Sequence, residues 1–247
     1  MANPPVPVAL GLMMALSVFE MAVPVVAERR GDGGTDGTRG TPWHAHHIAE
    51  RYSLLVIITL GEVITGTVLA ISAVVQEHGW SVEAVLVAFG GTLLAFGMWW
   101  AYFIVPSGRV LHRYRERSFW WGYLHIVLFG SVAAVGAGLH VAANVLAHEA
   151  HEIDATFALW TVAVPVIVFL VMLSVLSELL VRRFDAFHLG MLVAALAIVA
   201  IAIAASAAGA TLGTTIVVVA LAPLTVVVGH ETVGYRKSEA DLERLGV

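Results

Sequence analysis

Residues 186–230 read AFHLGMLVAALAIVAIAIAASAAGATLGTTIVVVALAPLTVVVGH and contain no Asp, Glu, Lys or Arg. A helix crosses the hydrocarbon core of a bilayer with roughly 20 apolar residues, and it satisfies its backbone hydrogen bonds internally. The stretch is long enough for two such helices. Glycine and threonine interrupt the Ala/Ile/Val pattern at residues 208–213, which predicts the turn between them. We therefore predict a membrane-embedded helical hairpin in this part of the chain.

The rest of the sequence shows the same pattern of apolar runs separated by polar residues. Only 13% of the 247 residues are charged, about half the fraction of a soluble domain. We therefore predict an all-α fold, a polytopic integral membrane helix bundle that forms one transmembrane domain over residues 1–247. The seven transmembrane helices are expected at about 6–27, 48–75, 82–105, 118–147, 155–181, 187–207 and 214–230.

The positive charges fall on alternate loops. Twelve of the 13 Lys and Arg residues follow the first, third, fifth or seventh predicted helix, and the loops at 76–81, 149–154 and 208–213 contain none. Cytoplasmic loops carry the excess of positive charge. The N-terminus is therefore expected outside the cell and the C-terminus in the cytoplasm.

The two remaining polar segments are expected on the cytoplasmic side, as a flexible loop at 28–46 and a tail at 236–247. A cleaved signal peptide would carry positive charge before its apolar run. Residues 1–7 are uncharged, so we expect the first helix to be retained in the membrane.

The composition excludes several classes of protein. The chain has no cysteine, and therefore no disulfide, no thiol nucleophile and no cysteine-ligated metal centre. The net charge of -5 argues against a nucleic-acid-binding protein. A retinal-type receptor needs a buried lysine for its Schiff base, whereas the one lysine is Lys237 in the predicted tail. We expect no cofactor and no enzymatic activity.

Ionisable side chains inside the predicted helices are the candidate functional residues, because charge in hydrocarbon is costly and other helices normally shelter it. Glu62 lies 12 residues after Glu50, about 18 Å at 1.5 Å per residue, and so near the middle of the membrane. The polar residues on its helix face form a stripe that is expected to face other helices or water: Arg51, Thr59, Thr65, Ser72 and Gln76.

Glu20 and His125 are expected in the cytoplasmic half of the membrane, as neighbours of Glu62. Two interpretations of Glu62 remain open. It is either part of a relay for protons or cations, or a protonated carboxyl group whose hydrogen bond fixes the packing of the helices.

Histidines form two clusters. One precedes the second helix and includes His44, His46 and His47; the other, of His140, His148 and His151, shares one face at the end of the fourth helix. Three imidazoles on one face can bind zinc, but polar groups at a helix end that faces water are usually solvated. We therefore predict no metal site. If a metal ion does bind, His140, His148 and His151 are the weak candidate ligands.

A basic loop follows the third predicted helix. Its arginines lie between two groups of aromatic residues, which are typical of the membrane interface. We expect this loop to attract anionic lipids through Arg109, Arg113, Arg115 and Arg117.

The stretch from His47 to Glu62 contains a His-x-x-Glu-Arg element followed by an apolar run that ends in Leu-Gly-Glu. It resembles the bacterial low temperature requirement protein A (LtrA) family. His47, Glu50, Arg51, Gly61 and Glu62 match the family element residue by residue. Further similar elements are Trp99, Trp100, Tyr102 and Phe103, and Tyr123-Leu124-His125 followed by Gly136.

Members of that family usually begin with further helices that carry a Glu-Leu-Phe-Phe-Asp-Leu element, which this sequence lacks. The chain therefore resembles the C-terminal part of a family member. A homo-oligomer or a partner chain that supplies the additional helices is expected.

The resemblance implies a multi-pass protein of the bacterial inner membrane with an unknown molecular activity. The family's name implies that it supports growth or envelope function in the cold. The alternative is a proton- or cation-coupled transporter or channel that uses the stripe around Glu62. A third hypothesis is a metal-dependent membrane hydrolase that uses the outer histidines.

Overall fold

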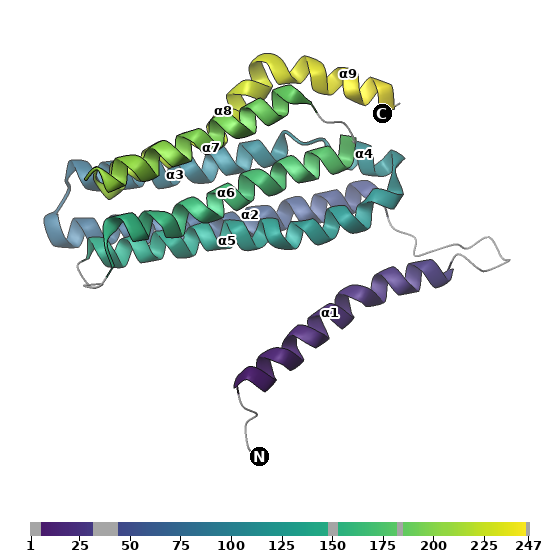
Figure 1. Cartoon of the computed structure of the whole chain (residues 1–247), viewed down its shortest axis with the longest axis horizontal. Coiled ribbons are helices and arrows are strands. Elements are labelled where there is room, and N and C mark those ends of the chain that lie inside the picture. Colours follow the sequence, from purple (N-terminus) through teal and green to yellow (C-terminus); the bar gives the residue numbers. More distant parts are fainter. Residues whose placement is uncertain (1–5, 32–43, 148–152, 182–184, 246–247) are drawn as a thin grey trace. The chain divides into compact units, whose positions relative to one another are not determined.

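The computed structural model describes residues 6–31, 44–147, 153–181 and 185–245, and every regular element in these ranges is a helix. Among these residues, seven helices are long and apolar enough to cross a membrane, so the predicted all-α, multi-pass architecture is confirmed; the orientation of the termini stays a prediction. The elements are α1 (Val6–Gly31), α2 (Ala45–His78), α3 (Val82–Phe103), α4 (Ser107–Arg113), the 3₁₀ turn η1 (Arg115–Arg117), α5 (Ser118–Leu146), α6 (Ala155–Val181), α7 (Ala186–Ala207), α8 (Leu212–Gly229), the π-helical turn η2 (His230–Gly234) and α9 (Tyr235–Leu245) (Figure 1).

Several helices extend beyond their predicted ends. The expected loop at 28–46 is helical at both ends, since α1 continues to Gly31 and α2 begins at Ala45; residues 32–43 lie outside the described ranges. The expected tail contains the amphipathic helix α9. The predicted bounds come from the apolar runs alone. The helices are longer because Glu, Arg and Lys also favour a helix, so the helix continues beyond the apolar run.

The chain divides into two compact units, residues 1–44 and 45–247, where the sequence suggested one domain. The division follows the Gly-rich segment that separates the first apolar run from the rest. The first unit contains α1, which is apolar over residues 6–27 apart from Ser17 and Glu20. A helix of this kind is typical of a lipid-embedded segment.

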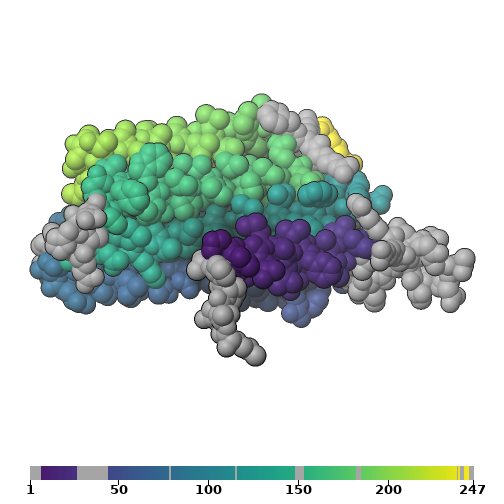
Figure 2. Space-filling view, turned by 60° about the horizontal axis from the view of Figure 1, so that its bottom comes forward, coloured from purple at the N-terminus to yellow at the C-terminus, as the bar shows by residue number. Residues whose placement is uncertain are grey.

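The second unit contains the other six long helices in two layers (Figure 1). In one layer α5 packs between α2 and α6, and in the other α8 packs between α3 and α7; the pairs α2–α3 and α6–α7 connect the layers. In Figure 2 the surface of α5 and α6, in teal and green, continues into that of α7, which changes from green to yellow-green. The short helix α4 and the C-terminal helix α9 lie at the same end of this unit (Figure 1).

Glycines allow the helices of the second unit to approach closely. A Cβ atom added at Gly66 would lie 2.6 Å from the backbone oxygen of Gly136, and one at Gly136 would lie 2.6 Å from the backbone of Glu62. The backbones of α2 and α5 are therefore in contact, as small residues permit in membrane helices. Fully buried apolar side chains of the same two helices include Val63, Val132 and Val135, and the ring of His140 also lies beside Gly66.

The predicted turn at 208–213 is confirmed. α7 ends at Ala207, α8 begins at Leu212, and Gly209 between them has a φ of +91°. Glycine adopts this left-handed conformation without the steric cost that a Cβ atom brings. The hydroxyl group of Thr211 then accepts a hydrogen bond from the backbone N–H of Thr214 and caps the start of α8.

Candidate functional site

His125 lies at the centre of a buried aromatic group that we call the His125 cluster, formed with Tyr52 of α2, Tyr102 of α3, and Trp121 and Phe129 of α5. The imidazole Nδ1 lies 2.7 Å from the carbonyl oxygen of Trp121. Because a carbonyl oxygen only accepts, Nδ1 carries the proton. The Tyr102 hydroxyl group then donates to Nε2 at 3.1 Å.

This arrangement makes His125 a packing residue. Its side chain is fully buried, and both ring nitrogens have hydrogen-bond partners in the neutral form, as buried polar groups normally require. The aromatic rings around it come from three different helices. The His125 cluster therefore fixes how α2, α3 and α5 meet near one end of the bundle.

The residues of the His-x-x-Glu-Arg element lie together in the first turns of α2. The Nε of Arg51 donates to Nε2 of His47 at 3.3 Å, and Nδ1 of His47 lies 3.8 Å from a carboxylate oxygen of Glu50. All three side chains are exposed. Beside them, the rings of His46 and His112 are 5.5 Å apart, which brings the start of α2 next to α4.

Glu62 is exposed on the surface of the second unit, so the expectation that neighbouring helices shelter it is wrong within this unit. The backbone of Glu62 and its Cβ atom pack against Gly136 of α5. The inward face of α2 carries Val56, Val63 and Ala70, all without exposure. The other residues of the polar stripe are exposed at Arg51, Thr65 and Gln76 and half-buried at Thr59 and Ser72.

The expected neighbours of Glu62 do not come together around it. The residue of α2 beside His125 is Tyr52, ten residues before Glu62, or about 15 Å along the helix. His125 and Glu62 therefore do not form one site by direct contact. Glu20 lies on α1 in the first unit and stays a candidate from the sequence alone.

The outer histidines give no evidence for a metal centre. His140 is half-buried, and its Nε2 is buried without a hydrogen-bond partner in the part of the chain that the structure describes. His148 and His151 lie outside that part. Within it, no group of three or more His, Asp or Glu side chains is arranged to hold a metal ion.

The basic loop splits into two kinds of arginine. Arg109 and Arg113 are exposed, as expected for side chains that meet lipid headgroups. Arg117 is buried: its guanidinium group donates to the backbone oxygen of Leu180 and lies 3.9 Å from the ring centroid of Tyr114. It thus connects the start of α5 to the end of α6 and is not available to a headgroup. The side chain of Arg115 is outside the described set.

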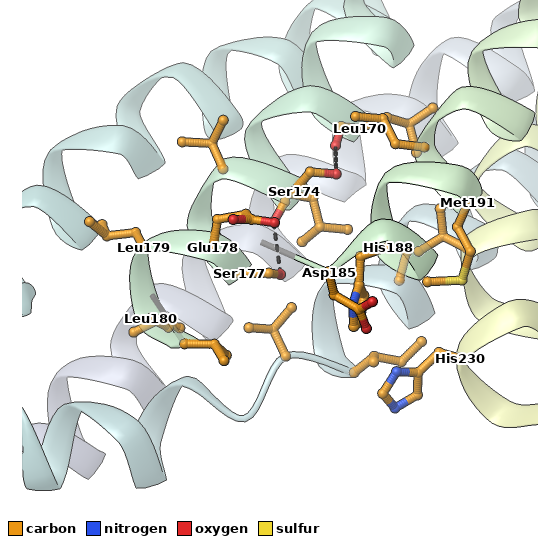
Figure 3. A pocket seen from close by; sticks show the side chains of 18 of the residues that line it. Leu170, Ser174, Ser177, Glu178, Leu179, Leu180, Asp185, His188, Met191 and His230 are labelled. Carbon is orange, nitrogen blue, oxygen red and sulfur yellow. Dashed lines mark hydrogen bonds and ion pairs between the residues drawn. The ribbon is translucent and has the colours of Figure 1, made fainter. Parts of the chain in front are cut away.

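A cavity that the sequence did not predict lies between α6 and α7. It has a volume of about 570 Å³, and the ends of α3, α4 and α8, the π-helical turn η2 and Leu242 of α9 complete its wall. Most of the wall is apolar, as at Leu170 and Met191. Figure 3 shows Glu178 from α6 and Asp185 and His188 from α7 around the same space. The volume is typical of a small-molecule site.

The negative charge of Asp185, at the polar end of this cavity, is balanced by neighbouring groups. One carboxylate oxygen accepts a hydrogen bond from the backbone N–H of Phe187 at 3.0 Å. The Nζ of Lys237 lies 3.4 Å from both carboxylate oxygens, and Nδ1 of His188 lies 3.3 Å from one of them. The hydrogen bond from Phe187, followed by the charges of Lys237 and His188, holds the pKa of Asp185 below its usual value.

Glu178 differs from Asp185. Its half-buried carboxylate lines the cavity and makes no hydrogen bond or ion pair with another described residue. The nearby hydroxyl groups of Ser174 and Ser177 donate to backbone oxygens of their own helix, at 3.0 Å and 2.9 Å. Among the described residues, Glu178 is therefore a hydrogen-bond acceptor and negative charge without a partner in a mostly apolar space.

A sequence signal for this cavity exists. Ser174, Ser177 and Glu178 lie near the end of one apolar run, and Asp185 and His188 lie at the start of the next. Polar residues near the ends of membrane helices are common, however, because the headgroup region accommodates them. Only the packing of several elements shows that these side chains enclose a space.

Comparison with known proteins gives one match. The family model described as "Bacterial low temperature requirement A protein (LtrA)" matches residues 2–223. No curated protein and no solved structure matches the chain.

Proposed function

Because the chain belongs to the bacterial low temperature requirement A family, we propose that it is a non-enzymatic inner-membrane protein that supports growth or envelope function in the cold. Family membership and seven apolar helices make it an integral membrane protein. Its position in the inner membrane and its role in the cold belong to the proposal.

The apolar packing between α2, α3 and α5 supports the proposal that the protein has a supporting rather than a catalytic or conducting role. Fully buried side chains between α2, α3 and α5 are apolar at Val56, Val87, Leu94 and Leu128. The buried imidazole of His125 is satisfied by Trp121 and Tyr102. Such packing suits a scaffold in the lipid bilayer.

The cold-growth role is tested with a deletion strain of the source bacterium. We expect normal growth at moderate temperature, slow growth in the cold, and recovery when the wild-type gene is returned. Glu62→Gln should restore cold growth as well as the wild type does, provided that both proteins reach the same level in the membrane. A deletion strain that grows like its parent in the cold would contradict the proposal.

Transport of protons or cations is the second candidate, and the exposed carboxyl group of Glu62 near the middle of a membrane span is the observation that favours it. Flux in proteoliposomes should then depend on Glu62. Glu62→Gln is the test variant, and Glu50→Gln, at the exposed start of the same helix, is the matched control. Equal flux in the wild type and in Glu62→Gln would remove this candidate.

The proposal includes two kinds of partner, anionic lipids and a second protein chain. The exposed Arg109 and Arg113 suit anionic lipid headgroups. The exposed Glu62 favours shelter by a second copy of the chain or by a partner chain. Lipid that copurifies with the protein should contain less anionic lipid after Arg109→Ala and Arg113→Ala, and an unchanged composition would count against the lipid contact.

A further inference from the structure

The cavity between α6 and α7 combines an apolar part that can hold a hydrocarbon chain with a polar end that can hold a headgroup. The helices on either side are membrane spans, Ala155–Val181 and Ala186–Ala207, so a hydrocarbon chain can enter from the bilayer. Its walls are apolar at Leu170, Leu173 and Met191, so a hydrocarbon chain can pack against them by van der Waals contact.

The polar groups of the cavity lie where a headgroup would be. Glu178 is three residues from the end of α6, and Asp185 and His188 lie at the start of α7. Three residues of helix are about 4.5 Å, so these groups lie close to the end of the spans, where headgroups meet water. A bound amphiphile would thus place its chain along Leu170 and Met191 and its head near Glu178.

The charge at this end of the cavity decides which headgroup fits. The negative charge of Asp185 is balanced by Lys237, with further contacts from His188 and the Phe187 backbone. Glu178 has no such partner among the described residues. Among the described residues of the cavity wall, the charge that remains is negative, and a cationic group that also donates hydrogen bonds would balance it.

We propose that the cavity between α6 and α7 binds an amphiphile with a hydrocarbon chain and a primary ammonium head, and that the head pairs with Glu178. An amphiphile with an anionic head is disfavoured, since its charge would face the carboxylate of Glu178 without compensation. The site does not depend on the proposed role in the cold, so either proposal can fail without the other.

Binding of tritiated hexadecylammonium to the full chain in phosphatidylcholine nanodiscs tests this site, with empty nanodiscs as the blank and hexadecanoate as the probe of opposite charge. We expect saturable binding of hexadecylammonium above the blank and weaker binding of hexadecanoate. Glu178→Gln should weaken the binding of hexadecylammonium by up to about fivefold, which corresponds to the upper value for a partly exposed ion pair. Glu231→Gln is the matched control, because Glu231 is an exposed carboxylate outside the cavity wall.

A second variant keeps the test decisive if Glu178→Gln does not fold. Ser174→Phe adds bulk at a half-buried position of the cavity wall and should reduce the binding of hexadecylammonium without changing any charge. The proposal is overturned if nothing binds above the blank or if hexadecanoate binds as tightly as hexadecylammonium. Equal binding of hexadecylammonium to the wild type and to folded Glu178→Gln, or to folded Ser174→Phe, overturns it as well.

Discussion

A histidine inside a membrane span attracts attention as a proton carrier, but the surroundings of His125 indicate a different role. Its Nδ1 donates to a backbone oxygen and its Nε2 accepts from Tyr102, so the neutral ring is fully hydrogen-bonded. The rings of Tyr52 and Trp121 pack against it at centroid distances of 4.9 Å and 4.1 Å. The energetic contribution of His125 is therefore expected in the stability of the fold.

Tyr102→Phe tests the hydrogen bond to His125. The substitution keeps the ring but leaves Nε2 of a buried imidazole without its donor, and we expect a loss of about 1 kcal/mol in the free energy of unfolding. Equilibrium unfolding in mixed micelles measures it. Tyr235→Phe is the control, since that exposed hydroxyl group bonds only to Glu239 among the described residues; equal losses in both variants would contradict the role of the cluster.

Asp185 predicts a dependence of stability on pH. Its pKa is lowered in the folded chain, chiefly by the hydrogen bond from the Phe187 N–H and then by Lys237 and His188. The stabilisation is therefore complete above the ordinary pKa, about 3.9, and is lost as the pH falls through the lower folded value. Asp185→Asn should be less stable than the wild type at neutral pH.

Unfolding curves recorded from neutral to acidic pH check this prediction. The difference between the wild type and Asp185→Asn should shrink below about pH 4, where the aspartate begins to take up its proton. Glu243→Gln, at an exposed position of α9, should give no comparable difference. A constant difference across the whole pH range would show that Asp185 stabilises the fold without its charge.

At the scale of elements, the contact between α2 and α5 shows how membrane helices choose their packing faces. Two glycines on facing helices, Gly66 and Gly136, bring the backbones together. The polar stripe of α2, which includes Glu62 and Thr65, lies on the exposed side instead. In lipid no hydrophobic force separates polar from apolar helix faces in the way that water does, so close van der Waals packing decides the contact.

Gly136→Ala tests this contact. The added Cβ would lie 2.6 Å from the backbone of Glu62 and force the helices apart, at a cost of about 1–3 kcal/mol. Gly130→Ala is the matched control on the same helix, because nothing lies within 4 Å of its added Cβ. Alanine favours a helix over glycine, so the control should be neutral or stabilising by up to about 1 kcal/mol. Similar unfolding free energies for both variants would contradict the close contact.

At the scale of the whole molecule, the distribution of positive charge predicts an orientation in the membrane. Twelve of the 13 Lys and Arg residues lie in the polar segments that follow the apolar spans of α1, α3, α6 and α8. This bias places those loops in the cytoplasm and the N-terminus outside. Exposed residues at both ends of the second unit, such as Gln76 and Arg113, can report which side they face.

Because the chain has no cysteine, single-cysteine variants test the orientation without background. Gln76→Cys should react with a membrane-impermeant maleimide in intact spheroplasts, and Arg113→Cys should react only after the membrane is permeabilised. Labelling of denatured protein controls for the reactivity of each cysteine. The opposite pattern would reverse the orientation derived from the charges.

The sequence by itself determined the helices, the turn near Gly209 and the cluster of His47, Glu50 and Arg51. Each of these depends on local rules, because a helix in lipid must satisfy its own hydrogen bonds and residues three or four apart share a helix face. The same local pattern could not predict that Glu62 faces outward, since periodicity identifies a polar face but not the face that packs.

Only the tertiary structure decided which helices are neighbours. It separated His125 from Glu62 and placed the rings of Tyr52 and Tyr102 around His125. It also joined the ends of several elements into the cavity that Glu178 lines. Contacts of this kind depend on shape and on the small residues of the facing helix, and both belong to parts of the chain that are far apart in sequence.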